Sequence, residues 1–172
     1  PPYTSSAASD VYKRQAMNSG ATPLFMASQN GHVDVVRVLV EQGADINKPR
    51  ASNGCTPLYV ASEKGHMDVV RMLLEQGADI DKANKNGFTP LLIASQNGHV
   101  DVVRVLLEHG ADINKAMNKG ATPLLIASQN GHVDVVRVLL EHGADINKAM
   151  NKGATPLLIA SQNGHVDVVR VL

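Results

Sequence analysis

The sequence predicts an all-α fold, a solenoid of stacked helix–turn–helix units joined by β-hairpin-like loops, because two short motifs recur at a fixed period. The motif Thr-Pro-Leu begins at Thr22, Thr56, Thr89, Thr122 and Thr155. The motif Gly-His begins at Gly31, Gly65, Gly98, Gly131 and Gly164. Successive copies in both series are 34, 33, 33 and 33 residues apart. A period of this size is typical of solenoids, in which each repeat is one small supersecondary unit.

The unit at 116–148 shows how the first helix of each repeat is specified. Thr122 is a favourable N-cap residue, and Pro123 suits the first helical position because its missing N–H needs no partner there. Gly131 follows eight residues later and can adopt the left-handed conformation that ends many helices. The pattern therefore predicts a short first helix that ends at Gly131.

A second helix is predicted from His132 to the residue before Gly143. Asp134 lies in its first turn, where a carboxylate complements the positive end of the helix dipole. One buried face of this helix is expected to hold Val135, Val136, Leu139 and Leu140. A unit this small cannot bury that face alone, so it must stack on its neighbours.

The period divides the chain into a leader and one repeat domain. The domain is expected at 16–172, with units at 16–48, 49–82, 83–115, 116–148 and 149–172, the last of them truncated. The leader at 1–15 is expected to be non-native or disordered, because 5–15 resembles the translation of a sequencing adapter.

The last unit stops inside its second helix, and 89–139 is identical to 122–172. We therefore expect a fragment of a longer array. Recent duplication and mis-assembly of repetitive reads would both produce this identity.

These motifs and their period resemble the ankyrin repeat family, whose units carry Thr-Pro-Leu and a 33-residue period. The resemblance covers 16–172 and implies a stack that binds other proteins through loop tips and first helices. Two family positions differ here. The His after Thr-Pro-Leu is replaced by Phe25, Tyr59, Leu92, Leu125 and Leu158. The Asp three residues before the first Gly is replaced by Met17, Ala51, Asn84, Met117 and Met150. The family uses both positions for hydrogen bonds between units, so we expect that bonding to weaken unless the apolar replacements are buried.

The composition excludes several classes of function. Lys and Arg number 16 and Asp and Glu number 16, so the surplus of cations that nucleic-acid binding needs is missing. The chain has two Phe, three Tyr and no Trp, which is too few for aromatic stacking of bases. No apolar run approaches the ~18 residues of a membrane span, so no membrane association is expected.

The candidate reactive groups favour no catalysis, no metal and no cofactor. His132 and its equivalents in the other units are expected to serve the turn into the second helix by local hydrogen bonding. Cys55 is the single cysteine, and no histidine pattern activates it. The glycines are spaced by the repeat and do not form a phosphate-binding loop.

One modification is suggested by resemblance. The spacing from Leu39 to Asn47, repeated at Asn114 and Asn147, resembles the target of asparaginyl hydroxylases that act on ankyrin repeats. Unit two carries Asp81 instead. The alternative is that these asparagines only shape the turn.

The resemblance also implies a protein-binding surface, carried over by position onto units two to four. It comprises Ser52, Asn53, Cys55, Glu63, Lys64, Gln76, Lys85, Asn86, Phe88, Gln96, Asn97, His109, Asn118, Lys119, Ala121, Gln129, Asn130 and His142. Phe88 is the expected anchor because aromatic residues dominate interface hot spots, although it could instead pack on its own hairpin.

We therefore expect a cytoplasmic, monomeric scaffold or adaptor whose partner is another protein of unknown identity. One alternative is the targeting arm of an enzyme, such as a kinase or a ubiquitin ligase, whose catalytic domain lies outside this fragment. A designed or purely structural spacer array is a further alternative, which the identity of the units favours.

Overall fold

The structure, a computed structural model, describes residues 20–151 and 153–172. The leader expected at 1–15 lies outside the described residues. In the described part, ten α-helices and no β-strand occur. The first helices of the five units are α2 (Pro23–Gln29), α4 (Pro57–Lys64), α6 (Pro90–Asn97), α8 (Pro123–Asn130) and α10 (Pro156–Gln162). The second helices are α3 (Val33–Glu41), α5 (Met67–Glu75), α7 (Val100–Glu108), α9 (Val133–Glu141) and α11 (Val166–Val171).

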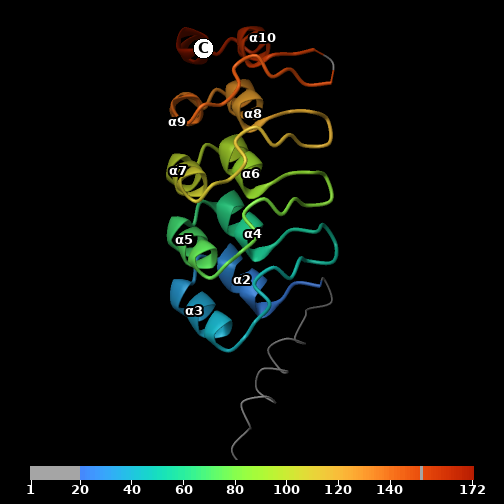
Figure 1. Ribbon diagram of the computed structural model, residues 1–172, viewed down its shortest axis with the longest axis vertical. Coiled ribbons are helices and arrows are strands. Elements are labelled where there is room, and N and C mark those ends of the chain that lie inside the picture. Colours follow the sequence, from blue (N-terminus) through green and yellow to red (C-terminus); the bar gives the residue numbers. More distant parts are fainter. Residues whose placement is uncertain (1–19, 152) are drawn as a thin grey trace, which may run out of the picture.

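The first helices and the second helices form two columns that run along the stack (Figure 1). Each first helix packs on the first helices of neighbouring units, each second helix packs on its own neighbours, and the two helices of a unit pack on each other. The loops at 42–56, 76–89, 109–122 and 142–155, here called the fingers, project beyond the column of first helices. The predicted all-α solenoid is confirmed.

The ends of the helices follow the predicted signals. The Thr122 hydroxyl accepts a hydrogen bond from the Leu125 N–H (3.3 Å), and Pro123 occupies the first turn of α8. Gly131 then adopts a left-handed conformation with φ of 75° and ends the helix. The same arrangement recurs at α4 and α6, so each first helix is limited to about two turns by its own residues.

The buried face of the second helix differs from the prediction at one position. Val135, Val136 and Leu139 are buried, but Leu140 is only half-buried and Val138 is buried in its place. The equivalent of Val138 in unit one is Val38, which is exposed. The helix therefore buries a second stripe against the preceding unit, which the periodicity of one isolated helix does not reveal.

Burial of the central leucine of Thr-Pro-Leu also depends on a neighbouring unit. Leu124 is 1% exposed, and its equivalents in units one to three are buried to the same degree. Leu157, the equivalent in the fifth unit, is 46% exposed. The side chain is the same in both places, so the difference arises from the following unit that covers Leu124.

The histidine of Gly-His joins neighbouring units, so the local hydrogen bonding expected for it is wrong. His132 Nε2 lies 2.8 Å from the Gln96 carbonyl oxygen of the preceding unit, and a carbonyl can only accept, so Nε2 carries the proton. His66, His99 and His165 make the equivalent bond to the unit before them. The ring reaches this carbonyl by packing on a glycine, because a Cβ on Gly98 would lie 2.8 Å from His132 Nδ1.

The apolar replacements at the family's His position are buried in four units, which meets the condition set by the sequence for offsetting the lost bonds. Phe25, Tyr59, Leu92 and Leu125 are each at most 5% exposed, whereas Leu158 is 57% exposed. At the family's Asp position, Met117 and Met150 pack at the edge of the cluster that contains Leu92 and Leu125. Apolar packing therefore occupies positions that the family uses for polar bonds.

We predict that Leu124→Ala destabilises the protein by about 2–5 kcal/mol, because it leaves a cavity between two repeats. Leu157→Ala removes the same atoms from a half-exposed position and is expected to cost less than about 1 kcal/mol. Urea unfolding followed by circular dichroism measures both free energies. Equal costs for the two variants would contradict burial between repeats as the source of stability.

We also predict that Gly98→Ala destabilises the protein more than Gly110→Ala in the same unit. Both glycines have positive φ, so both variants carry the left-handed strain of about 1–2 kcal/mol. Only the new methyl group at position 98 meets His132, while position 110 has no atom within 4 Å. We expect Gly98→Ala to lose a further ~1 kcal/mol of unfolding free energy, because the His132 hydrogen bond is displaced. Urea unfolding measures this difference between the two variants, which should vanish in a His132→Ala background.

Candidate functional site

The fingers are compact loops that stack on one another. The finger of unit three is closed by a hydrogen bond from the Asn84 N–H to the Phe88 carbonyl (2.9 Å), and the next by one from the Met117 N–H to the Ala121 carbonyl (3.0 Å). Neighbouring fingers are joined through the Asn151 N–H and the Lys119 carbonyl (3.3 Å). They are hairpin-like as expected, although no described residue has strand structure.

Most of the predicted binding residues lie on the fingers and on the last turns of the first helices. Among them, Glu63, Phe88 and Gln96 are half-buried. The exposed members of this group are Ser52, Asn53, Lys64, Lys85, Asn86, Asn97, Asn118, Lys119, Gln129 and Asn130. These side chains form the accessible face of units two to four.

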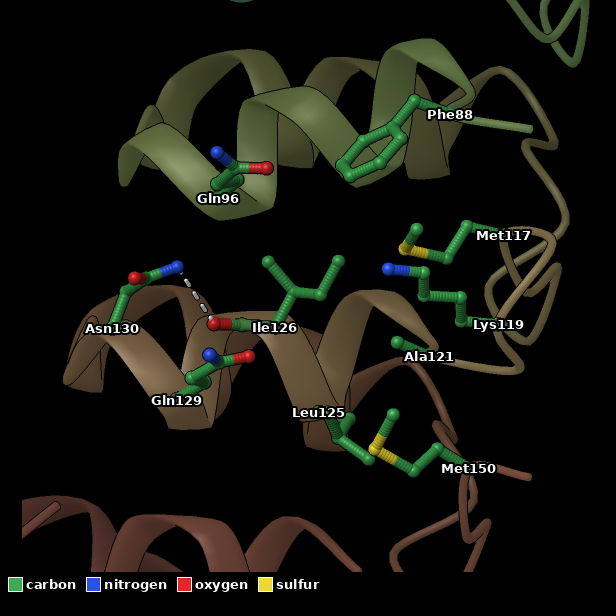
Figure 2. Close-up of a pocket in the computed structure, with 10 residues that line it drawn as sticks. All are labelled: Phe88, Gln96, Met117, Lys119, Ala121, Leu125, Ile126, Gln129, Asn130 and Met150. Carbon is green, nitrogen blue, oxygen red and sulfur yellow. Dashed lines mark hydrogen bonds between the residues drawn. The ribbon is translucent and has the colours of Figure 1, made fainter. Parts of the chain in front are cut away.

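A groove of about 320 Å³ opens on this face over unit four, and residues of units three and five complete its lining. Figure 2 shows Phe88 and Met117 on one side of the groove and Met150 beside Leu125 on the other. The predicted residues that line the groove are Phe88, Gln96, Lys119, Ala121, Gln129 and Asn130.

Sequence reasoning assigned no binding role to the two methionines that line the groove, Met117 and Met150. Both stand at the position where the family has Asp, and that departure is the signal that could have identified them. The unbranched thioether side chain adapts to irregular surfaces, so it suits a contact surface.

The other five predicted residues lie elsewhere: two are buried, and Gln76, His109 and His142 are exposed at the ends of second helices. Cys55 and Ala121 are each 5% exposed, so they lie beneath the surface, although Ala121 lines the floor of the groove. Gln76, His109 and His142 cap the ends of α5, α7 and α9 and do not line the groove. The two histidines bond backward instead, each through Nδ1 to a carbonyl of its own helix, at 2.8 Å.

Burial raises the pKa of the Cys55 thiol, which disfavours the nucleophilic thiolate. Among the described residues, no three His, Cys, Asp or Glu side chains gather where they could hold a metal ion. No helix in the described part of the chain combines the length and the apolarity needed to cross a membrane.

Two of the three asparagines predicted as hydroxylation targets form part of a second ladder between units. The Asn47 side-chain oxygen accepts a hydrogen bond from the Asp79 N–H (2.8 Å), and Asn114 accepts one from the Asp145 N–H (3.0 Å). The turn itself is shaped by aspartate, since Asp45 Oδ1 accepts from the Asn47 N–H (3.0 Å). The alternative that these asparagines only shape the turn is therefore incomplete. Hydroxylation of Asn47, Asn114 and Asn147 stays a prediction.

Unit two continues this ladder with a carboxylate. Both Asp81 oxygens lie 3.3 Å from the Asp112 N–H. Burial raises the pKa of Asp81, although the hydrogen bond from Asp112 and the charge of Lys115 oppose the shift. A raised pKa means that the folded state binds the proton more tightly than the unfolded state, so stability falls as pH rises through this range.

We predict that Asp81→Asn retains the bond to the Asp112 N–H and removes this pH-dependent loss. At about pH 7 the variant should be at least as stable as the natural protein, with a gain of up to ~0.5 kcal/mol. The difference should disappear below the ordinary carboxyl pKa of 3.8, where Asp81 is protonated and resembles the amide. Urea unfolding across this pH range measures the effect, and a less stable variant at neutral pH would contradict it.

The comparisons with known proteins address the family. A search of curated proteins found no match to the chain. The family model described as ankyrin repeats, in three copies, matches residues 7–84, 48–117, 79–150 and 115–172. Its first match begins within the expected leader, and together the matches cover nearly the whole chain. With its five helix pairs, its finger loops and these matches, the chain belongs to the ankyrin repeat family.

Proposed function

We propose that this array binds a partner protein through the fingers and first helices of units two to four. Ankyrin repeats are generally protein-interaction modules, which supports the class of function. The groove supports this location of the binding site, because Phe88, Met117 and Met150 line a hollow on a face that is otherwise polar. Apolar side chains within a polar rim are typical of interface cores.

Phe88 combines the two roles that the sequence left open, packing on its own finger and anchoring a partner. Its ring packs against both apolar clusters beneath the fingers, yet it is half-buried and lines the groove. A partly packed aromatic side chain loses little conformational freedom on binding, so it can act as a pre-organised anchor. Met117 beside it and Met150 across the groove supply adaptable surface.

We propose no catalytic role and no cofactor for these residues. The burial of Cys55 and the raised pKa of its thiol support this proposal. The alternative of an enzyme's targeting arm concerns sequence beyond this chain, and sequencing of the intact gene tests it. The monomeric state and the cytoplasmic location stay predictions.

We predict that Phe88→Ala and Met117→Ala each weaken capture of the partner at least tenfold, because about 1.4 kcal/mol corresponds to a factor of ten and anchors often exceed it. The immobilised protein and its variants are incubated with a lysate of the source cells, and bound proteins are quantified by mass spectrometry.

Met67→Ala is the matched control, because Met67 is also half-buried but lies on α5, away from the groove. Urea unfolding identifies any variant that has lost its fold. Capture that is equal for all variants, or no captured protein at all, would show that the groove is not the binding site.

A further inference from the structure

The charges of this neutral chain are divided between two faces. The first helices and the finger tips (49–55, 83–88, 116–121 and 149–154) carry Arg50, Lys64, Lys85 and Lys119 in the described residues, against the single carboxylate of Glu63. Each of α3, α5, α7 and α9 carries two acids and one arginine. Net charge counted unit by unit conceals this division, because each unit contributes to both faces. The groove therefore opens on the cationic face.

Lys119 is the cation at the groove itself. Lys119 is exposed, and its ammonium has no hydrogen-bond or ion-pair partner in the described part of the chain. The ion pair that the described residues do form joins Arg170 to Asp167. Figure 2 shows the Lys119 side chain beside Met117, with the nitrogen directed toward Ile126 across the groove. Lys85 differs, because its ammonium donates to the Ala51 and Ser52 carbonyls (2.8 and 3.1 Å).

The shape of the groove indicates how much of a partner it can hold. At about 320 Å³ it is near the lower end of the ~300–1,000 Å³ found for ligand pockets, which suits one or two side chains. The Gln96 and Gln129 amides at its edge offer both donors and acceptors to the backbone of an extended chain.

We propose that the groove binds an extended acidic and apolar segment of the partner protein. This inference rests on the proposed function and specifies the partner's chemistry. An apolar side chain of the segment fills the hollow between Phe88, Met117 and Met150, and a neighbouring carboxylate pairs with Lys119. The surrounding cations attract such a segment and repel a basic one, so charge contributes selectivity and a faster association.

A nucleic acid would also be attracted by cations, but the lining of the groove favours a peptide. Its floor is formed by methionine, leucine and isoleucine, and Phe88 is the one aromatic residue in its lining. Single-stranded nucleic acids bind through aromatic platforms on which successive bases stack. Thioethers and branched alkyl groups instead match the apolar side chains of a protein.

The proposal is tested with peptides selected without bias. Random 12-residue peptides displayed on phage are selected on the immobilised chain, and the selected sequences are synthesised with a fluorescent label. We expect them to place Asp or Glu beside Leu, Met or Phe, and to bind more weakly as NaCl concentration rises. Fluorescence polarisation should give a Kd at least tenfold weaker for Lys119→Glu and for Met117→Ala.

Lys148→Glu is the matched control, because it makes the same change of charge at an exposed position outside the groove. Its Kd should stay within about twofold of the natural value, since its side chain is exposed, does not line the groove, and exposed charges are screened by physiological salt.

Four results would overturn the inference. Selection of neutral or basic peptides that still lose affinity with Met117→Ala would refute the acidic partner but retain the groove as a protein-binding site. Equal weakening by Lys119→Glu and Lys148→Glu would refute the local role of Lys119. Tighter binding of a 20-nucleotide poly(dT) probe that displaces the peptides would indicate a nucleic-acid partner. If no peptide is selected, the inference is wrong, and the lysate experiment decides the proposed function separately.

Discussion

Burial of each unit's apolar faces against its neighbours is the interaction on which the structure depends. A helix pair of this size has two apolar sides, represented in unit four by Leu124 toward the following unit and Val138 toward the preceding one. Neither side is covered by the unit's own residues, as the exposed equivalents Leu157 and Val38 show. Stability is therefore a property of pairs of units more than of single units.

Two polar ladders set the register of this apolar stack. The histidines of units two to five donate to a carbonyl of the preceding unit, and the Asn or Asp side chains of units one to three accept from a backbone N–H of the following unit. Both bonds connect the backbone of one unit to a side chain of its neighbour, so they fix the position of neighbours in a way that apolar contact alone does not.

The same stacking builds the candidate site. Fingers from neighbouring units are brought together by the packing of their helices, and the groove lies where Phe88 of unit three, Ile126 of unit four and Met150 of unit five meet. Because the finger tips and first helices carry Glu63 as their single described acid, while α3, α5, α7 and α9 carry two acids each, stacking also adds like charges along each face. A chain with no net charge thereby acquires a cationic binding face.

The sequence by itself determined the repeat period, the helix caps and the class of fold, because these depend on residues close in the chain: Thr122 caps its own helix, and Gly131 ends it. It also identified much of the accessible face, including Lys119 and Gln129. Only the tertiary structure decided that His132 bonds to Gln96, that Cys55 and Ala121 are buried, that His109 turns back on its own helix, and that Met117 meets Phe88 in a groove. Most of these features depend on which residues about 33 positions apart lie in contact, and that contact is made by the packing of whole units.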